Sequence, residues 1–176
     1  YEESYGYLAG NYVRDKDAVN ASMLICEMAA FYRTKGISLI QARENMYKTY
    51  GVYYHTQQSF TFEGKAGMEK MNSIMENLRK NYVAEIGGLK VILFEDYLEG
   101  ISKNVETGKI TEIKLPKSNV LVFGLTDGAK VIIRPSGTEP KIKAYYTAIG
   151  ETQSDAQALE KKLAESFSKL INLSLI

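Results

Sequence analysis

The stretch from residue 131 to 145 places the strongest constraint on the fold. Two apolar runs, rich in β-branched and aromatic residues, flank the loop Arg134-Pro-Ser-Gly-Thr-Glu-Pro140. Such runs predict two strands. The loop between them gathers a guanidinium, two hydroxyls and a glycine within five residues. The sequence therefore predicts a small polar loop at the tip of a strand pair.

The composition of this loop suits a bound phosphate. Arg134 offers a planar fork of donors that matches a phosphate, and Ser136 and Thr138 add hydroxyl donors. Gly137 can adopt positive φ and turn backbone N–H groups inward around an anion. Lys141 adds positive charge, although at the start of the next strand it could equally point to solvent. The order of a Walker loop is absent, and an ordinary turn built from Pro, Ser, Gly and Thr is the alternative.

The first eighty residues read as mostly helical. Asp17 can cap a helix that stops at Lys35-Gly36, and Ser38 with Gln41 forms a capping-box pattern before a second helix that ends at Gly51. A Tyr-rich strand is predicted for residues 52–62. A third helix is predicted where methionines and a leucine repeat at helical spacing, at Met68, Met71, Met75 and Leu78.

The remaining sequence predicts strands followed by a helix. Residues 101–115 are polar and read as mostly loop, Asp127-Gly128 is a hairpin signal, and Ser154 with Gln157 is expected to open the last helix. The expected strands cover residues 89–97, 119–125, 129–134 and 141–149. The predicted fold class is α+β: a C-terminal antiparallel sheet covered by helices, preceded by a helix-rich remnant of an α/β domain.

Three segments are predicted along the chain. Residues 1–80 form the first part. Residues 81–88 carry Asn and Gly-Gly ends and read as a linker or hinge. Residues 89–176 form a C-terminal phosphate-binding domain.

Two motifs resemble a known family. The run Arg134-Pro-Ser-Gly-Thr-Glu-Pro-Lys-Ile-Lys143 closely resembles the phosphate-binding loop in the last domain of the α-D-phosphohexomutases, the phosphoglucomutase and phosphomannomutase family. Tyr1-Glu-Glu-Ser-Tyr-Gly-Tyr-Leu8 resembles the family's sugar-binding loop, and Val13-Arg-Asp-Lys-Asp17 follows at the family's spacing. The resemblance implies that residues 1–80 are the end of the sugar-binding third domain, and that residues 89–176 are the fourth domain.

The resemblance also implies roles for residues near the start. Glu2 and Ser4 are expected to bind sugar hydroxyls, and Lys16 is expected to face the sugar phosphate or the bridging oxygen, where it could stabilise charge or donate a proton. From the residues alone, Glu2 and Glu3 would be a solvated terminus. Arg14 and Lys16 would be a charged helix entry.

The implied activity is a phosphoryl transfer between the 1- and 6-positions of a hexose through a bisphosphate. In the family, a phosphoserine donates the group, and Mg2+ and a hexose 1,6-bisphosphate take part. This sequence has neither the family's serine loop nor its metal loop. We therefore expect no mutase activity and no bound cofactor from these residues alone, with the N-terminal domains of the same parent chain as partners.

Glucose or mannose phosphates are the expected substrates. A phosphopentomutase, an amino-sugar phosphomutase and a non-catalytic phosphate-binding module are the alternatives. A net charge of +1 makes no case for nucleic acid or membrane binding. One cysteine and no visible signal peptide favour the cytoplasm. Because the first residue is Tyr, we expect a piece of a longer protein.

Overall fold

Local signals set the two helices of the first fifty residues. The computed structural model describes residues 7–12, 14–62, 64–81, 83–137 and 139–173. Asp17 caps α1 (Ala18–Thr34) by accepting hydrogen bonds from the backbone N–H groups of Val19 and Asn20, as predicted. Ser38 and Gln41 exchange the expected capping-box bonds at α2 (Leu39–Tyr50). Both helix starts therefore depend on contacts between residues only two or three positions apart.

The chain divides into two compact units, Tyr1–Tyr50 and Gly51–Ile176. The first unit leaves most of its apolar residues in solvent. In α1, Val19 and Phe31 are 81% and 52% exposed, and Ala21 is the buried apolar residue of that helix. Helix propensity and caps, rather than a core within this unit, account for α1 and α2.

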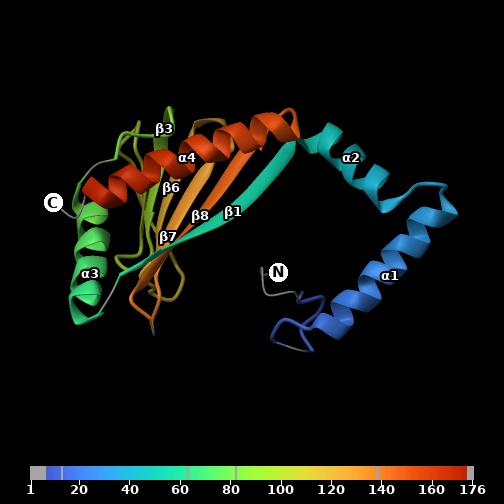
Figure 1. Ribbon diagram of the computed structural model, residues 1–176, viewed down its shortest axis with the longest axis horizontal. Helices are drawn as coiled ribbons and strands as arrows, with labels where there is room; N and C mark the ends of the chain where they lie inside the picture. Colours follow the sequence, from blue (N-terminus) through green and yellow to red (C-terminus); the bar gives the residue numbers. More distant parts are fainter. Residues whose placement is uncertain (1–6, 13, 63, 82, 138, 174–176) are drawn as a thin grey trace. The chain divides into compact units, whose positions relative to one another are not determined.

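The second unit is built on one antiparallel sheet (Figure 1). Its strands follow the spatial order β1-β8-β7-β6-β3-β4-β5, and β2 pairs with β3 off this path. The strands are β1 (Val52–Thr61), β2 (Glu85–Ile86), β3 (Leu89–Asp96), β4 (Ile101–Asn104), β5 (Ile110–Glu112), β6 (Leu121–Leu125), β7 (Lys130–Pro135) and β8 (Lys141–Gly150).

Two helices, α3 (Gly64–Lys80) and α4 (Gln153–Leu173), pack against the same face of the sheet (Figure 1). Met71 and Met75 of α3 are buried as predicted, while Met68 stays 39% exposed. Phe167 of α4 is fully buried, and its ring centroid lies 6.1 Å from that of Phe123 and 6.2 Å from that of Tyr146. This core confirms the α+β class with a helix-covered antiparallel sheet.

The predicted linker at residues 81–88 is not the boundary between the compact units. Ile86 is fully buried in the core, and Gly87 and Gly88 form the turn between β2 and β3 with φ of +62° and +86°. The division falls instead between Tyr50 and Gly51, because β1 pairs along its whole length with β8. The Gly-Gly pair therefore marks a hairpin turn rather than a hinge.

Two other expectations were wrong in detail. Residues 101–115 contain the short strands β4 and β5, which pair across a turn at Gly108, where the prediction was mostly loop. The last helix is capped two residues early, by Thr152 and Asp155 rather than by Ser154 and Gln157. The Asp127-Gly128 turn is confirmed, since both residues have positive φ between β6 and β7.

Candidate functional site

The polar loop lies at the tip of the β7–β8 hairpin. Arg134 stands directly opposite Lys143 in the strand register, and Pro135 stands opposite Ile142. Ile142 is fully buried, so alternation along the strands puts Arg134 and Lys143 on the face of the sheet away from the helices. The hairpin thereby presents a guanidinium and an ammonium side by side on that face.

Backbone hydrogen bonds shape the loop itself. The N–H of Ser136 donates to the carbonyl of Lys141 at 2.8 Å, and the N–H of Lys141 donates to the carbonyl of Glu139 at 2.7 Å. The N–H of Glu139 donates to Ser136 Oγ at 3.3 Å, which orients that hydroxyl. The loop is therefore held by its own polar groups, as expected for a short connection that must keep its shape.

Charge at the loop is mainly positive. The ammonium of Lys141 lies 2.6 Å from a carboxylate oxygen of Glu139. The hydrogen bond and the charge of Lys141, with a smaller effect of Lys143, lower the pKa of the Glu139 carboxyl. Arg134 and Lys143 carry like charges and stand directly opposite each other in the strand register. The loop region therefore favours an anionic ligand.

Lys143 is the neighbour of Arg134 that the sequence analysis left out of the site. Counting residue pairs outward from the loop would have placed Lys143 opposite Arg134, because opposite residues of an antiparallel strand pair share a face of the sheet. Lys141, which the analysis did include, is engaged by Glu139 in this structure.

Gly137 differs from the expectation. Its φ is not positive, so the backbone does not need glycine for that reason. An added Cβ would meet no atom within 4 Å among the described residues. The backbone at Gly137 is therefore open to approach from outside the loop.

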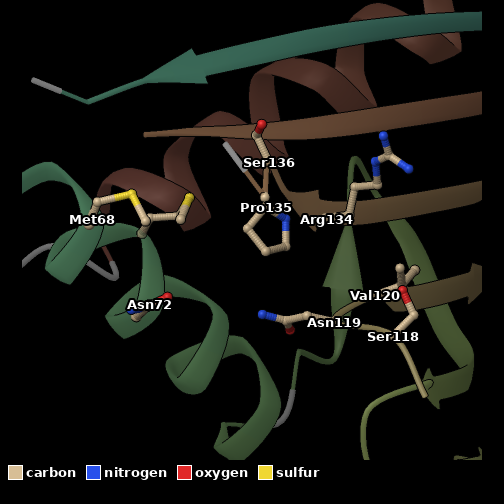
Figure 2. A pocket seen from close by; sticks show the side chains of 10 residues that line it. Met68, Asn72, Ser118, Asn119, Val120, Arg134, Pro135 and Ser136 are labelled. Carbon is tan, nitrogen blue, oxygen red and sulfur yellow. The ribbon is translucent and has the colours of Figure 1, made fainter. Parts of the chain in front are cut away.

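A hollow of about 440 Å³ lies behind the loop. The ring of Pro135 points into it, while the side chains of Arg134 and Ser136 point away from it (Figure 2). The guanidinium of Arg134 and the hydroxyl of Ser136, which suit a phosphate, therefore face away from the hollow, although both residues form part of its wall. Its wall is formed by Met68, Met71, Asn72, Ser118, Asn119, Val120, Arg134, Pro135, Ser136 and Gly137.

A buried ion pair stands behind this wall. Arg79 Nε donates to Asp96 Oδ2 at 2.6 Å, and a terminal nitrogen of Arg79 donates to Asn119 Oδ1 at 2.8 Å. Asp96 is fully buried. The sequence analysis missed this network, and no local pattern marks it, because α3, β3 and the segment before β6 are far apart along the chain.

The other predicted residues lie apart from this loop in the chain. Lys16 belongs to the first unit, where its backbone N–H donates to Asp15 Oδ1 at 2.8 Å and its ammonium lies 3.4 Å from the same oxygen. These contacts lower the pKa of the Asp15 carboxyl, the backbone hydrogen bond most. Glu2, Ser4 and Thr138 lie outside the described residues.

The described part of the chain contains neither a cluster of metal-ligating side chains nor a membrane-crossing helix. No group of three or more His, Cys, Asp or Glu side chains within it could hold a metal ion. None of its helices is long and apolar enough to cross a membrane.

The polar loop lies within a region that matches a known protein family. Residues 71–166 match the family described as phosphoglucomutase/phosphomannomutase, C-terminal domain. The match covers more than half of the chain and includes the whole β7–β8 hairpin. The chain belongs to this family. Its polar loop is thus part of a phosphoglucomutase/phosphomannomutase C-terminal domain.

Relatives with known names agree with this assignment. The chain is 41% identical over 148 residues to a phosphoglucomutase of Staphylococcus haemolyticus, covering 84% of this chain and 27% of that protein. It is 44% identical over 147 residues to a phosphoglucomutase of Staphylococcus aureus, covering 84% and 26%. The chain therefore spans about a quarter of the length of these enzymes.

The fold also resembles a solved structure. The crystal structure of pp63/parafusin, a phosphoglucomutase from Paramecium in its open form, matches with a TM-score of 0.55 and 18% identity. The match covers 93% of this chain and 28% of that one. It supports the fold.

Proposed function

We propose that this chain is the sugar- and phosphate-binding C-terminal part of a phosphohexomutase. The parent enzyme would interconvert hexose 1-phosphate and hexose 6-phosphate through a bisphosphate, with glucose preferred over mannose because the named relatives are phosphoglucomutases. The loop at the tip of the β7–β8 hairpin would hold the phosphate that is not reacting. Binding energy spent there positions the reacting end of the sugar.

The arrangement of Arg134 and Ser136 at this loop carries the proposal. Arg134 and Lys143 supply adjacent positive charges on the exposed face of the sheet, and Ser136 supplies a hydroxyl that the loop backbone orients. Gly137 leaves open space over the backbone, which lets an anion approach the N–H groups. Thr138 would add a second hydroxyl.

The first unit would complete the substrate site in the parent chain. Glu2 and Ser4 would accept or donate hydrogen bonds to sugar hydroxyls, and Lys16 would stabilise charge near the transferred phosphate. Mg2+ and the phosphoserine would come from N-terminal domains of the parent chain, in the cytoplasm. Arg134 would supply the fork of donors for the phosphate, and Lys141 and Lys143 would add positive charge beside it.

Titration with inorganic phosphate tests the loop. Backbone amide shifts of the 176-residue chain should report weak binding at residues 134–143. Arg134→Ala removes a charge-assisted pair worth about 1.5 kcal/mol at an exposed position, which is about a tenfold loss of phosphate affinity. Lys130→Ala removes a cation from the same face of the same strand, away from the loop, and should leave the affinity nearly unchanged.

The variant Gly137→Ala separates an effect on phosphate binding from an effect on stability. The unfolding midpoint should stay at the wild-type value, because the added Cβ meets open space and φ is ordinary. Phosphate affinity should fall, because the methyl group occupies the path of the anion. Equal phosphate binding by wild type, Arg134→Ala and Gly137→Ala would contradict the phosphate site and favour the ordinary-turn interpretation.

An assay of the parent enzyme with different sugar phosphates tests which substrate it prefers. Its turnover of glucose 1-phosphate, mannose 1-phosphate, ribose 1-phosphate and glucosamine 1-phosphate should be greatest for glucose 1-phosphate, with Mg2+ and a bisphosphate primer present. The 176-residue chain alone should turn over none of them. A parent chain without mutase activity would instead favour a non-catalytic binding module.

A further inference from the structure

In the wall of the hollow behind the polar loop, the side-chain amide of Asn119 is oriented by the Arg79–Asp96 ion pair. Arginine has donors and no acceptor, so its hydrogen bond to Asn119 must be made to the amide oxygen. The amide nitrogen of Asn119 is thereby turned to the other side, and it points into the hollow in Figure 2. The structure thus presents two amide N–H donors to an open space, with no freedom for the amide to flip without losing the bond to Arg79.

Arg79 is itself held firmly. Its side chain is 16% exposed and that of Asp96 is 1% exposed, with 2.6 Å between Nε and Oδ2. Asp96 Oδ1 accepts the N–H groups of Leu98 and Glu99 at 2.9 and 3.2 Å, so the carboxylate is fixed to the turn after β3. A wall group supported by two further layers of buried hydrogen bonds is pre-organised for a ligand.

The rest of the hollow combines small polar groups with apolar surface. Asn72 of α3 and Ser118 offer groups that both donate and accept, while Met68 and Pro135 offer apolar contact. Among the described side chains of the wall, Arg134 is the charged one, and its guanidinium points away (Figure 2). A volume of about 440 Å³ is within the range of small-molecule sites.

We propose that this hollow is a second binding site, which takes a neutral polyol or sugar ring. Its hydroxyl oxygens accept the N–H groups of Asn119 and exchange hydrogen bonds with Asn72 and Ser118, while its C–H groups lie against Met68 and Pro135. The guanidinium of Arg134 and the hydroxyl of Ser136 point away from this site (Figure 2). It does not depend on the phosphate proposal.

A single substitution tests the donor role of Asn119. Asn119→Asp keeps an oxygen for Arg79 and nearly the same shape, but it replaces both N–H donors with an acceptor. Titration of the 176-residue chain with unphosphorylated glucose, followed by amide resonances, should shift the side-chain N–H2 signals of Asn119 and Asn72 and the backbone signals near Ser118. We expect Asn119→Asp to weaken glucose binding at least tenfold with an unchanged thermal midpoint.

Asn104→Asp is the matched control. Asn104 also uses its amide oxygen as an acceptor, from the N–H of Thr107 at 2.8 Å, and it is exposed at the end of β4, away from the hollow. This variant should bind glucose as the wild type does. Ser118→Ala provides a second test, because it removes one hydroxyl from the wall and should weaken glucose binding even if Asn119→Asp fails to fold.

Two results would overturn the proposal. One is the absence of glucose-induced shifts at Asn72, Ser118 and Asn119 in the wild-type chain. The other is equal glucose affinity in wild type, Asn119→Asp and Ser118→Ala. Inorganic phosphate should shift residues 134–143 and leave the side-chain signals of Asn72 and Asn119 unchanged, so failure of the phosphate loop and failure of this hollow give different spectra.

Discussion

The buried carboxylate of Asp96 gives a direct test of what holds the second unit together. It accepts hydrogen bonds from Arg79 Nε at 2.6 Å and from the N–H groups of Leu98 and Glu99. Asp96→Ala leaves a guanidinium without its anion and two backbone donors without their acceptor. Breaking a buried pair in this way costs about 3–5 kcal/mol.

The exposure of the partner decides where in that range the value falls. The Arg79 side chain is 16% exposed, so water can reach part of the guanidinium after the substitution. We therefore expect a loss near the lower limit, about 3 kcal/mol. For a folded unit of this size, that is a fall of roughly 10 °C in the unfolding midpoint.

An exposed pair on the same helix is the matched control. Lys80 and Glu76 lie 3.0 Å apart, with side chains 72% and 62% exposed. Such a pair contributes about 0.5 kcal/mol or less. Urea unfolding of Asp96→Ala and Glu76→Ala should therefore give clearly different free energies of unfolding. If the two variants lose the same small amount, Asp96 does not anchor α3 to the sheet as its contacts indicate.

Two further predictions concern the β2–β3 turn and a buried tyrosine. Gly87→Ala should destabilise the chain much more than Gly88→Ala, because a Cβ at Gly87 would lie 2.9 Å from the backbone nitrogen of Leu163, whereas at Gly88 it meets open space. Equal unfolding midpoints would mean that this turn does not pack on α4. Burial and the charge of Glu160 raise the pKa of Tyr146 above its ordinary value of 10, so stability present below pH 10 should fall as the pH rises towards the higher folded value. Tyrosinate absorbance measured with thermal midpoints checks this, and a Tyr146→Phe variant with the same alkaline loss would assign the effect to another group.

Some features of the fold could be predicted because their causes are local. Asp17 reaches the N–H groups of its own first turn, and Ser38 bonds Gln41 across three residues. Asp127-Gly128 takes positive φ at both positions, which the hairpin needs. Each feature depends on neighbours within a few residues, so the sequence alone carries the information.

Other features were mispredicted because competing local patterns were similar. Ser154 with Gln157 was the expected start of the last helix, but the hydrogen bonds that open it join Thr152 and Asp155, which have the same spacing. Gly150 lies close to this helix start, since a Cβ at Gly150 would lie 2.5 Å from the Ala156 nitrogen. Most of the apolar residues of α1 are exposed, which their sequence alone does not reveal.

The sequence by itself determined the polar loop, the strands on either side of it and the methionine stripe of α3, because alternation and helical spacing are written in neighbouring residues. Only the tertiary structure decided that Lys143 faces Arg134, that Glu139 engages Lys141, and that Arg79 joins Asp96 to Asn119. The contacts of Arg79 bring together groups from separate elements. Their partners are chosen by strand register and by packing of the whole core, which no short stretch of sequence specifies.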